Sequence, residues 1–214
     1  MKKYLLLVLS LYLLSSFPSY GMMADNDRVI YGGGHPKTVS AKYDTKSPDI
    51  NFNIYKGQTG IGKESVEHKV YILFTGSYRP SKNYFRATAI PSKYEGDSGI
   101  DNLFYVESKD GWFYLAVESK YRADGKPQFD QGIRMADGKY AGQMLTEWLR
   151  QVAYNLKTLK NDYESHYKFI FNNPGKVVRA LAVGDKNGIF QIYALKDYSS
   201  WKRDTDILQA MFKK

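Results

Sequence analysis

The segment from Leu103 to Ser119 places the strongest constraint on how this chain can fold. Two runs rich in apolar and aromatic residues, 103–108 and 112–119, flank the turn-forming sequence Lys109-Asp110-Gly111. Asp-Gly between two such runs is typical of the tight turn of a β-hairpin. We therefore predict an antiparallel pair of strands in this part of the chain.

Apolar patterns elsewhere predict the remaining elements. Alternating or continuous runs of strand-forming residues predict further strands over 50–55, 70–75, 84–90, 167–172, 177–183 and 189–195. Apolar residues at spacings of three and four predict helices over 144–160 and after Ser199 or Ser200, with Trp201 on the apolar side of the second helix. Residues 120–138 are expected to form a long polar loop. The fold class is therefore α+β, a mainly antiparallel sheet covered by two helices.

The first 21 residues have the pattern of a secretory signal peptide. Lys2 and Lys3 precede the apolar run 4–14, and the small, turn-prone segment 15–21 ends in Gly21. The apolar run is much shorter than the ~20 residues of a membrane-spanning helix. We expect a cleaved signal peptide (1–21), a flexible N-terminal arm (22–48) and a single α+β domain (49–214). This organisation predicts a periplasmic or secreted protein.

Composition narrows the classes of chemistry and partner. The chain has no cysteine, which excludes a disulfide framework, a thiol nucleophile and a cysteine-based metal site. Its formal net charge of +9 favours contact with anionic surfaces. For an exported protein we expect an envelope or secreted protein as partner, or an anionic lipid or cell-wall polymer. We expect no nucleic acid and no transmembrane segment.

Two short motifs resemble catalytic sequences. Residues 57–63 fit the G-x-x-x-x-G-K pattern of a phosphate-binding loop, but Glu64 stands where Ser or Thr is needed, and a strand is predicted after it. The segment Gly96-Asp97-Ser98-Gly99 resembles the nucleophile segment of trypsin-like serine proteases, but the surroundings of His68 do not match that family. A flexible loop and a surface turn are the favoured interpretations.

Isolated histidines and carboxylates give no stronger signal. Glu107 and Glu118 flank the predicted hairpin and are candidates for a pair of carboxylates that face each other across it. Such a pair is disfavoured, because two like charges directly opposite each other repel. Three aspartates of the 120–138 loop offer an ion site, but solvated loop carboxylates are the favoured interpretation; they are Asp124, Asp130 and Asp137. The histidines, His35, His68 and His166, lack zinc-site spacing. No catalytic residue, metal ligand or cofactor is predicted.

Arginine and tyrosine side chains mixed along the predicted strands are the candidate binding residues. Tyrosine combines a large apolar ring with a polar end, which suits contact with a partner. The selected residues are Arg79, Arg86, Tyr105, Tyr114, Arg122 and Tyr193.

The last third of the chain has the pattern of a known fold. A helix (144–160) is followed by apolar runs at 167–171, 177–183 and 189–195, then by Trp201 and a closing helix that ends in Met211-Phe212. This pattern resembles the C-terminal part of the PsbP/Mog1-like α/β/α sandwich over about 70 residues. The resemblance implies an antiparallel sheet covered by helices. It also implies a non-enzymatic role, since members of that fold are mostly partners of larger assemblies.

The leading expectation is an exported, soluble, non-catalytic binding or assembly factor that contacts an envelope protein or an anionic polymer. The absence of a catalytic constellation, the tyrosine content and the basic charge support it. Two alternatives stay open. One is an exported hydrolase built on Ser98, His68 or the loop carboxylates, and the other is a secreted virulence or competition protein.

Overall fold

The structure is a computed structural model that describes residues 46–76, 85–94, 98–130, 132–134, 140–159 and 161–212. The predicted signal peptide, most of the predicted arm, and the candidate residue Arg79 lie outside this part of the chain.

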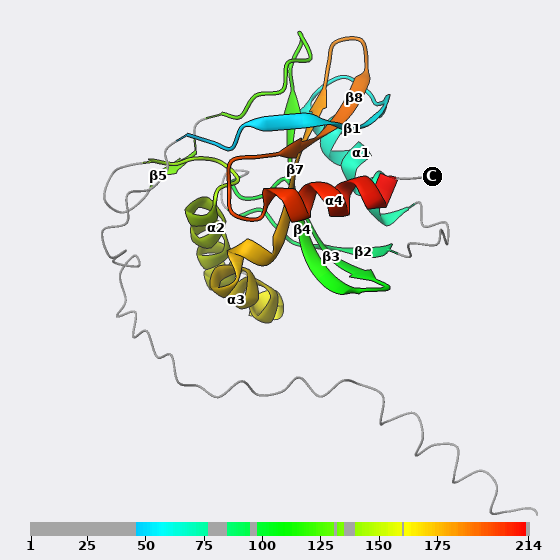
Figure 1. The fold of residues 1–214 in the computed structure, drawn as a ribbon. Coiled ribbons are helices and arrows are strands. Elements are labelled where there is room, and N and C mark those ends of the chain that lie inside the picture. The colour runs from blue at the N-terminus through cyan, green and yellow to red at the C-terminus, as the bar shows by residue number, and fades with distance from the viewer. Residues whose placement is uncertain are drawn as a thin grey trace, which may run out of the picture. The chain divides into compact units, whose positions relative to one another are not determined.

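A six-stranded sheet forms the centre of the fold (Figure 1). The strands, in their order across the sheet, are β1 (Ile50–Gln58), β8 (Ile189–Leu195), β7 (Val177–Gly184), β4 (Gly111–Tyr121), β3 (Asn102–Ser108) and β2 (Phe85–Ile90). Every neighbouring pair is antiparallel except β4 and β7, which run parallel. The parallel pair needs a long crossover connection, because a tight turn can join only antiparallel strands. The predicted α+β class with a mainly antiparallel sheet is confirmed.

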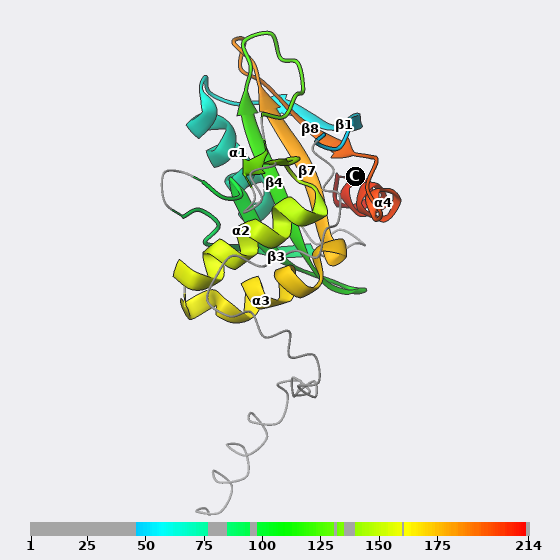
Figure 2. The ribbon, with the colours of Figure 1, turned by 90° about the vertical axis from the view of Figure 1, so that its left-hand side faces the viewer.

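Helices cover both faces of the sheet (Figure 2). They are α1 (Lys63–Thr75), α2 (Thr146–Leu159), α3 (Glu164–Asn172) and α4 (Trp201–Phe212). α1 and α4 pack against one face through buried residues that include Val66, Val70 and Leu208. α2 and α3 pack against the other face through residues that include Leu149 and Tyr167. Both faces are apolar, as expected when each must exclude water against a helix layer.

Shorter elements connect the main ones. β5 (Ile133–Arg134) pairs with β6 (Tyr140–Ala141), and 3-10 turns form at Asn161–Tyr163 and Pro174–Lys176. The segment 120–138 was predicted to be a loop throughout. It instead includes the end of β4, which continues to Tyr121, and the strand β5.

Two predicted strands are helices instead. Residues 70–75 belong to α1, where Val66, Val70 and Phe74 are buried at helical spacing. Residues 167–172 belong to α3, which buries Tyr167 and Ile170. A short continuous apolar run fits a buried strand and a buried helix equally well. The prediction of strands, which was based on composition alone, was therefore wrong for both segments. The described residues consequently form four α-helices, not the two predicted.

The elements with a clear period were predicted correctly. The hairpin of β3 and β4 turns at Lys109-Asp110 and pairs Phe104 with Leu115, both of which are fully buried. β7, β8, α2 and α4 lie where their patterns place them.

Candidate functional site

The candidate binding residues that the structure describes do not form one surface. Tyr105 and Tyr114 are paired across β3 and β4, with their ring centroids 5.7 Å apart. Arg122 follows the opposite end of β4, and Arg86 is exposed on the edge strand β2. Tyr193 lies on β8, which is separated from β4 by β7. Among the five candidates that the structure describes, only Tyr105 and Tyr114 are brought together.

The structure also separates the residues of the weighed motifs. Glu107 pairs with Trp112, so Glu107 and Glu118 do not face each other across the hairpin. Lys63, the last residue of the glycine-containing segment 57–63, is the first residue of α1, so a helix and not the predicted strand follows that segment. His68 is exposed on α1, whereas Ser98 lies at the border of a cavity described below.

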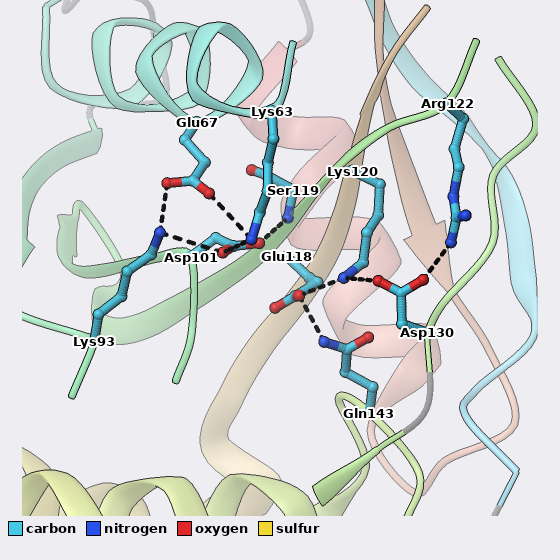
Figure 3. Close-up of polar contacts among 10 residues, drawn as sticks. All are labelled: Lys63, Glu67, Lys93, Asp101, Glu118, Ser119, Lys120, Arg122, Asp130 and Gln143. Carbon is cyan, nitrogen blue, oxygen red and sulfur yellow. Dashed lines mark hydrogen bonds and ion pairs between the residues drawn. The ribbon is translucent and has the colours of Figure 1, made fainter. Parts of the chain in front are cut away.

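A cavity of about 280 Å³ contains an unusual concentration of charge (Figure 3). We call it the carboxylate–lysine cavity, and its charged and polar residues include Lys63, Asp101, Glu118, Lys120, Asp130 and Gln143. Their side chains come from the start of α1, the adjoining ends of β3 and β4, and the segments that follow β4.

The sheet register brings the two central carboxyl groups together. Asn102 of β3 pairs with Val117 of β4, so Asp101, just before β3, lies beside Glu118. The backbone N–H of Ser119 donates a hydrogen bond to Asp101 Oδ2 at 2.8 Å. Because side chains alternate along a strand, Glu118 and Lys120 point to the same face of β4. The adjoining ends of β3 and β4 thus position two carboxyl groups and one lysine beside each other in the cavity.

Glu118 is the most unusual acid of the cavity. Its side chain is buried, and Oε1 accepts hydrogen bonds from Lys120 Nζ at 2.9 Å and from Gln143 Nε2 at 2.6 Å. Among the described residues no N–H or hydroxyl group reaches its other oxygen, Oε2, and the Glu118 carboxyl group also shares a side-chain hydrogen bond with Asp101. Burial, followed by the neighbouring Asp101, raises the pKa of Glu118 to about 8. Burial therefore favours the protonated form of Glu118.

Asp101 has the opposite protonation state. Burial acts to raise its pKa, but the Ser119 N–H and the charges of two lysines outweigh burial and keep the pKa below its ordinary value. Lys63 Nζ lies 3.0 Å and Lys93 Nζ 3.6 Å from Asp101 Oδ1. Both lysines also contact Glu67 of α1, at 3.4 and 2.7 Å. The Ser119 N–H and the lysines therefore favour the ionised form of Asp101, whereas burial favours the protonated form of Glu118.

Lys120 stays charged although it is buried. Burial acts to lower its pKa, but Glu118 and Asp130 outweigh that effect and raise it. Its Nζ lies 2.9 Å from Glu118 Oε1 and 2.7 Å from Asp130 Oδ2. Arg122 pairs with the second oxygen of Asp130. Two acids thus hold the ammonium group in a fixed position at the cavity.

The sequence contained one usable signal for this site. Glu118-Ser119-Lys120 places two charged residues two positions apart, directly after the buried, largely apolar stretch from Tyr114 to Val117 of the same strand. Charged residues are almost never fully buried unless they are paired, so this pattern indicates a polar site. Asp101, Lys93 and Gln143 carry no such signal, because only the sheet register and the chain connections bring them to Glu118.

Comparisons with protein-family models, with curated proteins and with solved structures find no match for this chain. The resemblance to the PsbP/Mog1-like sandwich therefore stays a prediction. Within the described ranges, every helix is too short or too polar to cross a membrane.

Proposed function

We propose that the carboxylate–lysine cavity binds a divalent cation such as Mg²⁺ between Asp101 and Glu118, and that the protein hydrolyses phosphodiester bonds there. One observation carries this proposal. A buried carboxyl oxygen, Glu118 Oε2, has no donor among the described residues and lies beside the ionised Asp101. In the cation-free protein a side-chain hydrogen bond with Asp101 stabilises the protonated Glu118, and a divalent cation between the two carboxylates would take the place of that proton.

The donor set suits magnesium. Mg²⁺ is commonly held by one or two carboxylates together with waters and the phosphate groups of a substrate. In the part of the chain that the structure describes, no group of three or more Asp, Glu or His side chains could hold a metal ion, so a cation here would have two carboxylate ligands and take its other ligands from water and substrate. Because a ligand must be ionised, binding would remove the proton of Glu118, and cation affinity should rise with pH.

The surrounding charges favour an anionic substrate. Four acidic side chains form ion pairs with four basic side chains around the cavity. The acids are Glu67, Asp101, Glu118 and Asp130, and the bases are Lys63, Lys93, Lys120 and Arg122. With Glu118 ionised these charges balance, so a bound divalent cation would make the site positive. Lys63 is half-exposed and therefore accessible to a phosphate group.

A bound Mg²⁺ would supply Lewis acidity and lower the pKa of a water molecule. The protein's own side chains supply the rest. Lys120 Nζ, fixed between Glu118 and Asp130, stabilises the negative charge that develops on the phosphoryl oxygens. Asp101 stays ionised because of its lysine neighbours, and Gln143 restrains the Glu118 carboxyl group. Fixed charges around a transferred phosphoryl group are the main requirement of this chemistry.

We propose a nucleic acid as the substrate, because the whole chain is basic, with a net charge of +9, and nucleic acids are densely charged phosphodiesters. This proposal departs from the expectations of no nucleic-acid partner, no metal and no catalytic residue. Those expectations were based on a search for known motifs and on the predicted export of the protein. The cavity was not found in that way, because its residues do not form a known sequence motif. Export itself remains a proposal, since residues 1–21 lie outside the described residues.

The test measures cleavage by the purified protein. Fluorescently labelled single-stranded DNA, double-stranded DNA and RNA are incubated with Mg²⁺, with Mn²⁺ or with EDTA. We expect cleavage of at least one of them with a divalent cation and none with EDTA. Absence of cleavage of all three polymers, and of a small phosphodiester such as bis-p-nitrophenyl phosphate, would refute the proposal.

A non-catalytic binding function is the second candidate, supported by an aromatic cluster around Tyr105 and Tyr114. Trp112, 45% exposed, lies 5.6 Å from the ring of Tyr105 and 4.9 Å from that of Phe169. Exposed tryptophans that pack on other rings are frequent anchors of interfaces.

If this surface binds an envelope or secreted protein, Trp112→Ala should weaken that contact at least about tenfold. The measurement is recovery of the partner from an envelope extract at physiological salt. Tyr71→Ala provides the matched control, because Tyr71 is an aromatic residue of similar exposure on α1. Equal recovery with all three proteins would exclude this surface.

A further inference from the structure

The turn that carries Gln143 contains a strained residue. The N–H of Leu145 donates a hydrogen bond to the carbonyl of Gly142 at 3.2 Å, which closes a turn with Gln143 and Met144 in its centre. Met144 has a φ of 65°, in the left-handed region that favours glycine or asparagine. Such a conformation persists when surrounding contacts determine it, and it is found preferentially at functional sites.

A buried arginine supplies the determining contact. Arg179 of β7 is fully buried, and its Nη1 donates a hydrogen bond to the carbonyl of Met144 at 2.9 Å. Its Nη2 donates to the carbonyl of Pro174 at 2.9 Å, and its guanidinium lies 4.5 Å from the ring centroid of Tyr198. The planar group is therefore fixed on several sides and ties the strained turn to the sheet.

Gln143 is the point at which this turn meets the cavity. It is buried, and its Nε2 donates to Glu118 Oε1, the same oxygen that Lys120 contacts. Both donors thus occupy one oxygen of Glu118. The second oxygen, Oε2, is left without a donor among the described residues.

We propose that Arg179 is a positioning residue of the carboxylate–lysine cavity: through the carbonyl of Met144 it fixes Gln143 against Glu118 Oε1, so that Oε2 stays directed at the cation position. Arg179 does not line the cavity and acts only through the turn. The importance of the inference rests on the proposed function, but the contact itself exists in the cation-free protein and can be measured there.

The test follows the side-chain amide of Gln143 by nuclear magnetic resonance in the cation-free protein. A short hydrogen bond to a carboxyl group should shift the resonance of one side-chain amide proton of Gln143 and slow the exchange of that proton with water. The signal is assigned by its absence from the spectrum of Gln143→Leu. In Arg179→Lys, a single ammonium cannot reproduce the two fixed bonds, so the Gln143 signals should move toward those of a free amide. Unchanged signals in Arg179→Lys would overturn the inference.

Two further variants separate positioning from general destabilisation. Leu208→Ala removes a buried side chain of α4 from the other face of the sheet, and it should leave the Gln143 signals in place. Met144→Gly keeps the carbonyl and suits the positive φ, so it should also retain them although a core side chain is lost. Loss of the signals in either variant would mean that the turn responds to packing and not to the Arg179 contact.

Two more measurements keep the inference testable if Arg179→Lys does not fold. In the unmodified protein the amide of Leu145 should exchange as slowly as the core amides of β7, and exchange at the rate of an exposed turn would overturn the inference. Mn²⁺ affinity should fall about tenfold in Gln143→Leu, as for other groups that orient metal ligands. If the unmodified protein binds no Mn²⁺, the proposed function fails, while the amide measurements still decide the role of Arg179.

Discussion

Replacement of Asp101 by Asn is expected to reduce cation-dependent phosphodiester cleavage by about 10²–10³-fold, the size of effect seen when one group that stabilises the transition state is removed from other active sites. Asp101 is the ionised partner of the buried carboxyl pair, and it orients Lys63 and Lys93. The amide keeps the shape of the side chain and can still accept the Ser119 hydrogen bond. It removes the negative charge that a divalent cation requires. Cleavage rates at saturating Mg²⁺ measure the effect, and calorimetric titration with Mn²⁺ measures the loss of binding.

The matched control is Glu107→Gln. Glu107 is an exposed carboxylate on the same hairpin, at the opposite end of β3 from Asp101. We expect this variant to cleave and to bind Mn²⁺ like the unmodified protein. Thermal unfolding of both variants verifies that they are folded. A folded Asp101→Asn protein with full activity would remove the chemical basis of the proposed function.

The second large effect concerns stability and pH. The pKa of Glu118 is about 8 in the folded protein, against an ordinary value of 4.5. Between these two values the folded state binds a proton that the unfolded state has released. The free energy of unfolding of the cation-free protein should therefore decrease as pH rises from about 4.5 to 8, by up to ~1.4 kcal/mol per pH unit. Glu118 contributes most stability at low pH, because burial disfavours only its ionised form.

Glu118→Gln should remove most of this decrease of the free energy of unfolding with pH. Glutamine has nearly the same shape and cannot ionise, so at pH 8.5 in EDTA the variant should be more stable than the unmodified protein by roughly 2–4 kcal/mol. Near pH 4.5 the two proteins should differ little. Asp101 does not obscure the comparison, because its pKa is lowered and its effect falls below pH 4. Urea unfolding at several pH values provides the measurement, and equal slopes for the two proteins would contradict the assigned state of Glu118.

The parts of the fold that were predictable are those with a distinct period or turn. The β3–β4 hairpin has Asp110-Gly111 between two apolar runs, and α2 has one apolar stripe on a polar helix. The runs 70–75 and 167–172 have neither feature, and tertiary packing decides their conformation. The parallel pairing of β4 with β7 also lies beyond local patterns, because it joins strands that are separated by two helices.

The candidate site was less accessible to sequence analysis than the fold. Glu118 and Lys120 could be found as charged residues in an apolar strand, and Asp130 and Arg122 were among the residues weighed. Asp101 joins them only through the strand register, and Lys63 joins only because α1 begins beside that pair. A site without a contiguous motif depends on tertiary contacts, so it becomes visible only in the folded chain.

The most direct test of the cavity as a cation site is the location of Mn²⁺ in crystals of the protein. Anomalous diffraction from crystals soaked in Mn²⁺ identifies the ion independently of activity. We predict one strong peak between the carboxyl groups of Asp101 and Glu118, within coordinating distance of Glu118 Oε2, and no such peak in Asp101→Asn crystals. Absence of a peak at these two carboxyl groups at millimolar Mn²⁺ would contradict the proposed function.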